Sequence, residues 1–318
     1  MLNRRILRIK AFKVMYGCAE DPSKSLAEAE SELEVSCEAT RSLYLFMLSV
    51  IPYLTREAAA RIENAKGKFN PTEEERNPNM KFVGNSIAPL LDSDPDLTKL
   101  LARRKLSWDP FDAFIRDTYD SMTGKRYFKN YMADPERSVA KDAALFVKMF
   151  EEEFVDSAAL EEILEDLSIW WNDDLAYALT VCCDTMKSFA KGNRWELPPL
   201  YRSDMLSPKP AESDRNFVTR LLRTSYSCYG KYFPLVASST DQWKEDRLFT
   251  TDTVLIIMGL AESKAFPDMP LRVTINEYVE ISKYYSTPKS RSFVNGLLDR
   301  LAKQLIAEGE IVKTGNFD

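Results

Sequence analysis

The sequence VTINEYVEISKYYSTPKSRSFVNGLLDRL, residues 273–301, is typical of two helices joined by a tight corner. Thr274 followed by Glu277 matches a capping box, which predicts the start of the first helix. Thr287 followed by Pro288 predicts the start of the second. Between the apolar faces of the two helices lie small or polar residues, namely Lys289, Arg291, Asn295 and Gly296. A ligand could approach these residues, but a helical hairpin with ordinary surface charges explains the pattern as well.

The composition indicates a globular protein. The chain has 318 residues, of which 45% are hydrophobic and 29% are charged, so it can bury one large core or two smaller ones. No run of about 18 apolar residues predicts a membrane span, and basic residues interrupt any signal-peptide core near the N-terminus. The five cysteines form no C-x-x-C pair, which fits a reducing compartment and argues against zinc. We therefore expect a cytoplasmic protein with no bound metal and no cofactor.

The sequence contains no histidine, and this limits the possible chemistry. Serine–histidine and cysteine–histidine catalysis are excluded within the chain, and the commonest metal ligand is missing. The net charge is −6 and the isoelectric point about 5.2, so the protein as a whole is a poor non-specific ligand for nucleic acid. Any RNA binding must come from a local basic patch.

Such a patch is present in residues 2–19, which are predicted to form a helix with two apolar stripes. Arg4, Arg5 and Arg8 lie between the stripes, and no acidic residue occurs before Glu20. A surface helix with extended basic side chains would explain this pattern. The concentration of positive charge within an acidic protein favours a phosphate-binding surface instead.

The remaining sequence predicts an all-α protein, because it shows no sustained alternation of apolar and polar residues. Residues 124–131, GKRYFKNY, are compatible with either an RNA contact or an amphipathic helix. Asp92, Asp94 and Asp96 resemble the start of a calcium loop, but the required glycine and glutamate are missing, so we interpret them as a turn before a helix. The proline-rich residues 192–211 indicate a linker or a long surface loop.

Three stretches together resemble the NusB family of transcription antitermination factors. They are RRILRIKAFKVMYG at residues 4–17, PLRVTINEYVEISK at 270–283 and FVNGLLDR at 293–300. The resemblance implies an all-helical, NusB-like bundle to which residues 1–20 contribute a basic helix and residues 212–318 the C-terminal helices. Residues 21–211 are then an additional helical region. It could be a second bundle, a degenerate duplicate or an insertion on a shared core.

The resemblance also implies a function and a set of partners. Proteins of this family bind boxA-like single-stranded RNA of ribosomal RNA leaders together with the ribosomal protein NusE, and so act indirectly on the RNA polymerase elongation complex. They are not enzymes. The implied partner contact is Asp252. The implied RNA contacts are Arg4, Arg5, Arg8, Tyr16, Lys289, Ser290, Arg291, Phe293 and Asn295.

Two other functions fit parts of the sequence. A helical protein–protein scaffold without RNA binding would explain the acidic charge and the large additional region. An enzyme using the carboxylates between Glu151 and Asp166 is a weaker alternative, because these acids have the pattern of a solvated helix face.

Overall fold

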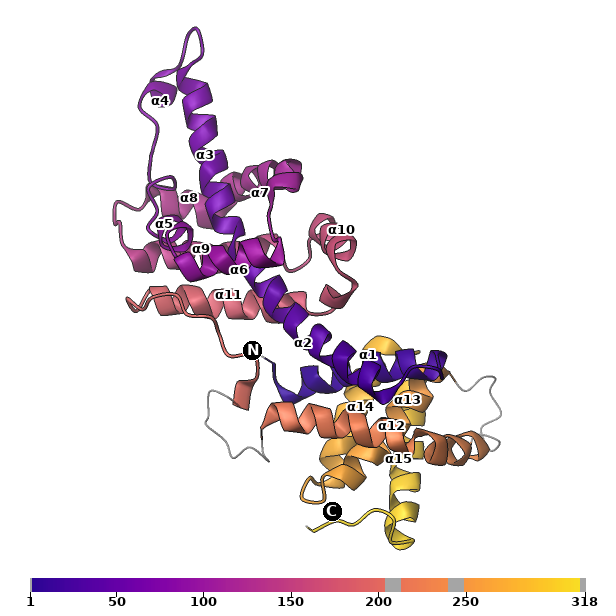
Figure 1. Cartoon of the computed structure of the whole chain (residues 1–318). Coiled ribbons are helices and arrows are strands. Elements are labelled where there is room, and N and C mark those ends of the chain that lie inside the picture. The colour runs from indigo at the N-terminus through magenta and orange to yellow at the C-terminus, as the bar shows by residue number, and fades with distance from the viewer. Residues whose placement is uncertain (1, 204–212, 240–248, 315–318) are drawn as a thin grey trace. The chain divides into compact units, whose positions relative to one another are not determined.

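The computed structural model describes residues 2–203, 213–239 and 249–314, and Figure 1 shows its helices. Within these ranges the regular secondary structure is entirely helical, apart from one isolated parallel β-bridge between Leu2 and Tyr201. The expectation of an all-α protein is therefore confirmed. None of the described helices is both long and apolar enough to cross a membrane.

The chain forms two compact units. The central unit comprises residues 38–198, and the terminal unit comprises residues 2–37 and 199–318 as far as they are described. Residues 21–37, which the sequence assigns to the additional region, cluster with the terminal unit because Glu30 and Glu34 form ion pairs with Arg223 and Arg215. The other expected boundary, at residues 211 and 212, lies outside the described residues.

The terminal unit contains the first and the last residues that the structure describes. Its elements are α1 (Arg4–Glu20), the first part of α2 (Leu26–Leu48), α12 (Asp214–Ser238), α13 (Thr250–Ala265), α14 (Leu271–Tyr285) and α15 (Ser290–Ala307). Helix α13 is buried along nearly its whole length and packs against α1, α12, α14 and α15. A methyl group on Gly259 of α13 would come within 2.6 Å of Leu298 Cδ2, so this glycine lets α15 approach closely.

Two helix starts differ from the sequence prediction. Helix α14 begins at Leu271 with Pro270 as its N-cap, so the predicted capping box of Thr274 and Glu277 is wrong. Thr274 is fully buried inside the helix, and its hydroxyl donates to Glu262 instead. Helix α15 begins at Ser290, after a turn that contains the predicted start. The Thr274 hydroxyl is thus engaged by a residue of another helix, α13, which the pattern of residues 273–277 could not reveal.

The central unit has its own core. After the end of α2, its elements are α3 (Val50–Lys66), α4 (Glu73–Arg76), α5 (Ile87–Asp92), α6 (Pro95–Arg104), η1 (Asp109–Phe111), α7 (Asp112–Gly124), α8 (Arg126–Ala133), α9 (Val139–Glu153), α10 (Ala158–Leu167), η2 (Ile169–Trp171) and α11 (Leu175–Phe189). Phe46 stacks on Trp108 at 4.0 Å and on Trp171 at 5.4 Å between ring centroids. Aromatic packing of this kind stabilises the core of this unit, whose buried cluster consists of residues between Ala39 and Trp195.

Two motifs of the central unit have structural roles. Asp94 caps α6 by accepting hydrogen bonds from the backbone of Asp96 and Leu97, which confirms the interpretation of that acidic stretch as a helix start. The predicted RNA motif at residues 124–131 forms most of α8, where Phe128 and Tyr131 are buried. The amphipathic helix is therefore the better explanation, because buried rings offer no stacking face to a base.

Candidate nucleic-acid interface

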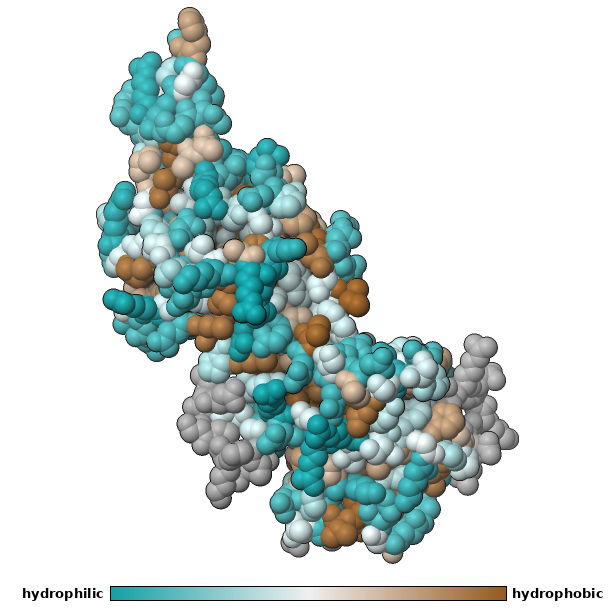
Figure 2. Space-filling model, viewed as in Figure 1, coloured by the Kyte–Doolittle hydropathy of each residue, from teal (hydrophilic) through white to brown (hydrophobic). Residues whose placement is uncertain are grey.

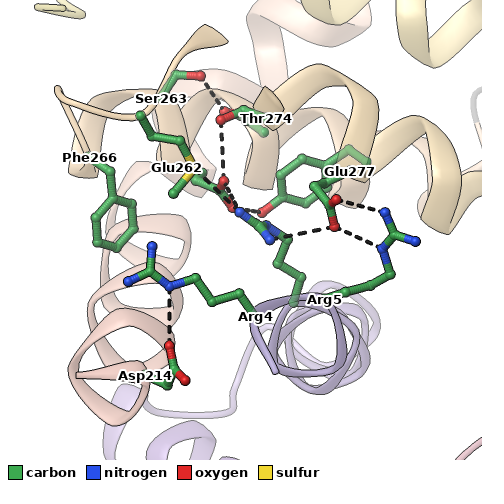
Figure 3. A network of polar contacts seen from close by, with 12 residues as sticks. Arg4, Arg5, Asp214, Glu262, Ser263, Phe266, Thr274 and Glu277 are labelled. Atoms are coloured by element: carbon green, nitrogen blue, oxygen red, sulfur yellow. Dashed lines mark hydrogen bonds and ion pairs between the residues drawn. The ribbon is translucent and has the colours of Figure 1, made fainter. Parts of the chain in front are cut away.

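Two arginines at the start of α1 are ion-paired but remain half exposed. Arg4 Nε donates to Asp214 Oδ1 at 3.2 Å, and the Arg4 guanidinium lies 4.9 Å from the centre of the Phe217 ring. Arg5 donates to both oxygens of Glu277, from Nε at 3.0 Å and from Nη2 at 2.7 Å (Figure 3). The Arg4 and Arg5 side chains keep 43% and 48% of their surface exposed. A polyanion can therefore reach both cations.

Arg8, by contrast, is buried, although the resemblance predicts that it contacts RNA. It is 3% exposed, and its Nε and Nη2 atoms donate to the two oxygens of the fully buried Glu262 at 2.8 and 2.7 Å. The hydroxyls of Thr274 and Tyr278 donate to the same carboxylate at 3.2 and 3.0 Å. Arg8 thus links α1 to α13 and α14, and protein shields its guanidinium from solvent.

The electrostatics of this buried network fit a structural role. Burial alone would lower the pKa of Arg8, but the hydrogen bonds and charge of Glu262 raise it above its usual value. Burial also raises the pKa of Tyr278 well above its usual value, and the charge of Glu262 acts in the same direction. Arg8 is therefore held as a cation and Tyr278 as a neutral hydrogen-bond donor, and both serve the one carboxylate.

The corner between α14 and α15 is fixed by a second buried contact. Ser290 is 3% exposed, and its hydroxyl donates to Asp252 Oδ2 at 2.7 Å while accepting from Ser286 at 2.8 Å. Asp252 is itself 3% exposed, and among the described residues its Oδ1 atom has no hydrogen-bond partner. The carboxylate, which the resemblance assigns to a partner contact, therefore faces the corner and lies in the first turn of α13, where the helix dipole favours it.

The other residues that the resemblance implies for RNA binding are at least partly accessible. Lys289 is exposed and forms the N-cap of α15, and Arg291 and Asn295 are exposed within that helix. Phe293 is half-buried. Tyr16, on α1, is 39% exposed.

A shallow groove follows the exposed side of the α14–α15 hairpin. Two adjoining hollows meet at Asn276 and Asn295, which line both of them. The exposed or half-exposed polar residues of α14 repeat every four positions, at Arg272, Asn276 and Glu280. Those of α15 repeat in the same way, at Arg291, Asn295, Asp299 and Lys303. This spacing places each set on one helix face, and it is the signal by which the sequence could have predicted Arg272 and Asn276.

The groove and the start of α1 share one electrostatic neighbourhood. The pKa of Glu280 is lowered, first by a hydrogen bond from Lys283 and further by the positive charges of Arg5 and Arg291. Arg5 belongs to α1 and Arg291 to α15, so both ends of the chain bring a cation close to the same carboxylate. Tyr285, at the end of α14, also packs against Phe12 of α1, with 5.3 Å between ring centroids. The two predicted halves of the RNA site, on α1 and α15, thus both contact α14.

The surface is cationic and amide-rich, but not uniformly basic. Glu277, Glu280 and Asp299 lie among the arginines, lysines and asparagines. Such a surface can bind phosphates at separated points and read base edges through its amides. In the part of the chain that the structure describes, no group of acidic residues or cysteines is arranged to hold a metal ion.

Comparison with known proteins locates a family match in the terminal unit and just before it. Residues 185–303 match the model of the NusB family. The transcription antitermination protein NusB of Salinibacter ruber is 33% identical over 103 residues, covering 32% of this chain and 64% of the relative. That of Natranaerobius thermophilus is 32% identical over 105 residues, covering 32% of this chain and 76% of the relative. The chain thus spans about two thirds of the length of these relatives, and no solved structure matches it.

Proposed function

The chain belongs to the NusB family, as a relative covered over 76% of its length shows, and on this basis we propose that it is an RNA-binding transcription antitermination factor. It binds boxA-like single-stranded RNA together with the ribosomal protein NusE, and acts on the elongation complex through that assembly. It performs no catalysis of its own. The observation that carries the proposal is the groove of α14 and α15 with Arg5 of α1 beside it.

The exposed residues divide by chemistry into three kinds of RNA contact. Arg4, Arg5, Lys289 and Arg291 supply positive charge for phosphate oxygens, and arginine also stacks on bases. Asn276 and Asn295 lie at the middle of the groove, where their amides can read base edges. Tyr16 and Phe293 offer aromatic faces for unpaired bases. Single-stranded RNA suits such a surface, since its bases can turn outward.

The buried members of the predicted site act on the exposed ones. Arg8 holds α1 against α13 and α14 and thereby positions Arg5. Ser290 and Asp252 hold the corner from which Lys289 and Arg291 project. In this proposal they are positioning residues, and NusE contacts the surface around Asp252 rather than its shielded carboxylate.

The carboxylates near the site do not prevent RNA binding. Phosphate must compete with Glu277 for Arg5, but an ion pair that is half exposed contributes only about 0.2–1 kcal/mol. A phosphate that replaces Glu277 recovers a comparable interaction and releases counterions. The acidic neighbours therefore lower the affinity for RNA in general and leave room for sequence preference.

A protein–protein scaffold without RNA binding is the alternative, favoured by the net charge of −6 and by the ion pairs of Arg4, Arg5 and Arg8. Fluorescence anisotropy with a labelled boxA-like RNA, with and without NusE, separates the two functions. A scrambled RNA of the same length is the control. We expect tighter binding to the boxA-like RNA, increased by NusE. Equal binding of both RNAs, or none with NusE present, would support the scaffold.

A further inference from the structure

A second surface lies in the central unit, before the residues 185–303 that match the family. Helix α10, η2 and the first turns of α11 enclose a shallow hollow. Leu164 and Trp171 form its buried floor, together with Leu179 from α11. Val155, before α10, borders it and is 51% exposed. The hollow is therefore apolar at its base and open to solvent.

Apolar side chains continue beyond the hollow. Leu167 at the end of α10 is 44% exposed, and Ile169 in η2 is 72% exposed. In Figure 2, hydrophobic groups lie beside hydrophilic ones in the region that α10 and the following turn occupy in Figure 1. Contiguous exposed apolar groups around a hollow mark interaction sites more often than scattered ones do.

The rim of the hollow is acidic. Glu161 and Glu165 lie one turn apart on α10, and Asp173, between η2 and α11, also lines the hollow. Among the described residues, neither Glu161 nor Glu165 forms an ion pair with a lysine or arginine. The sequence explains this, because residues 149–186 contain eleven acidic residues and no lysine or arginine. The negative charge of these two glutamates is thus not balanced from within their own stretch of chain.

We propose that this hollow binds a basic amphipathic helix of a partner protein. Leucine-like side chains of such a helix fill the hollow above Leu164 and Trp171, and its lysines or arginines pair with Glu161, Glu165 and Asp173. The helix-in-groove mode needs both an apolar floor and a complementary rim, and the hollow has both. Charge complementarity sets the orientation and the rate of association, while the apolar contact supplies most of the affinity.

The same charges disfavour two other occupants. RNA would bring phosphates to a rim that carries only negative charge, which costs free energy at every contact. A second copy of the chain that docked by the same surface would place two acidic rims against each other. A basic helix satisfies the rim and covers the apolar floor in one contact.

The test uses the whole chain of 318 residues and a synthetic probe. The probe is a fluorescent peptide of roughly 18 residues, about five helical turns, with leucine on one face and lysine on the rest. One control peptide has the same composition in scrambled order, and another has glutamate in place of every lysine. We expect the amphipathic basic peptide to bind at least about tenfold more tightly than either control. Equal binding of the scrambled peptide would overturn the proposal, because charge alone would then explain the affinity.

Two charge-matched variants locate the binding site. Glu161→Lys with Glu165→Lys should weaken peptide binding by about tenfold or more. Glu74→Lys with Asp117→Lys changes the net charge equally at exposed acids of α4 and α7, and it should leave binding nearly unchanged. Equal losses in both variants would overturn the assignment to this hollow, and circular dichroism checks that each variant is folded.

Two further readouts address the other occupants. Sedimentation that showed a dimer of the parent protein, abolished only in the α10 variant, would replace the partner helix by a second copy. Displacement of the peptide by single-stranded RNA would replace it by nucleic acid. None of these experiments depends on binding of boxA-like RNA. The test of the partner helix is therefore independent of the proposed antitermination function.

Discussion

Replacing Glu262 by glutamine tests the structural role of the buried network. The carboxylate is fully buried and accepts four hydrogen bonds, two from Arg8 and one each from Thr274 and Tyr278. Glutamine keeps the shape of the side chain but removes the charge that balances Arg8. An ion pair broken by removal of one buried partner typically costs about 3–5 kcal/mol of folding free energy. We expect a loss of this size in the stability of the terminal unit.

Hydrogen exchange measured by mass spectrometry reports this loss locally. Each 1.36 kcal/mol is a factor of ten, so amides of α13 that exchange through unfolding of the terminal unit should exchange about 150- to 5,000-fold faster in Glu262→Gln. Amides of α9, in the central unit, provide an internal reference. Peptides from α13 also contain the mutated position, so the comparison uses their fragments on either side of it.

A second substitution distinguishes charge imbalance from lost packing. Arg8→Met removes the cation, which has lost its main counter-charge and keeps only the longer 3.6 Å ion pair with Glu277, and it retains an apolar chain of similar length. We expect Arg8→Met to recover part of the stability lost in Glu262→Gln, with a coupling of about 0.5–3 kcal/mol. Exchange in Glu262→Gln within tenfold of the parent, or no recovery in the double variant, would refute the interpretation of this pair as a buried, mutually compensating network.

Three further predictions follow from single contacts. Gly259→Ala should lower the free energy of unfolding by about 1–3 kcal/mol in a urea titration, because the added methyl group overlaps a buried leucine of α15. At Gly296 an added methyl group meets open space, so Gly296→Ala should stabilise α15 by about 0.5–1 kcal/mol. Equal effects of the two substitutions would contradict this. Two lysine ammonium groups lower the pKa of Glu310 from 4.5 to about 2, so its stabilising ion pairs are complete above pH 4.5 and lost as the pH falls to 2. Glu310→Gln should therefore be less stable than the parent at pH 6 and equal to it near pH 2 in thermal melts. Glu277→Gln removes the carboxylate charge that pairs with Arg5, so RNA should bind more tightly in anisotropy titrations, and unchanged affinity would exclude Arg5 from the site.

The sequence was sufficient to predict the fold class and the helices that carry the site. The basic helix predicted over residues 2–19 corresponds to α1, and the apolar repeat in residues 273–301 corresponds to α14 and α15. Both signals are local, since they depend on the spacing of side chains along one helix. Both signals can therefore be recognised without knowing what each helix packs against.

Whether a charged side chain is exposed or buried in an ion pair depends on residues far away in the sequence, and the sequence did not reveal these pairings. Arg4, Arg5 and Arg8 look equivalent in the sequence, yet Arg8 meets a carboxylate 254 positions away and becomes buried. Glu277 shows the converse, because its predicted partner was a nearby backbone amide and its actual partner is Arg5. A local pattern contains no information about such pairings.

The four-residue spacing of polar side chains in the sequence would have predicted two further residues of the groove. Arg272 and Asn276 repeat at the spacing of four that also relates Arg291 to Asn295, and both pairs line the groove. The central hollow differs, because its apolar floor comes from helices whose pairing the sequence did not predict. Only its acidic rim was visible, and that alone indicated a solvated helix face.

The salt dependence of RNA binding tests the central claim most directly. That claim is that Arg5 of α1 and Arg291 of α15 contact one RNA strand on a common surface. The affinity of the full chain for a boxA-like RNA is measured over a range of salt concentrations, for the parent and for the double variant Arg5→Ala, Arg291→Ala. The control variant, Arg215→Ala with Arg223→Ala, removes two exposed, ion-paired arginines from α12.

Each phosphate contact on a single strand contributes about 0.7 to the slope of log affinity against log salt. We therefore predict weaker binding and a slope smaller by about 1.4 in magnitude for the Arg5, Arg291 variant, and a slope near that of the parent for the α12 control. An unchanged slope in the first variant, or an equal reduction in both, would contradict the proposed interface.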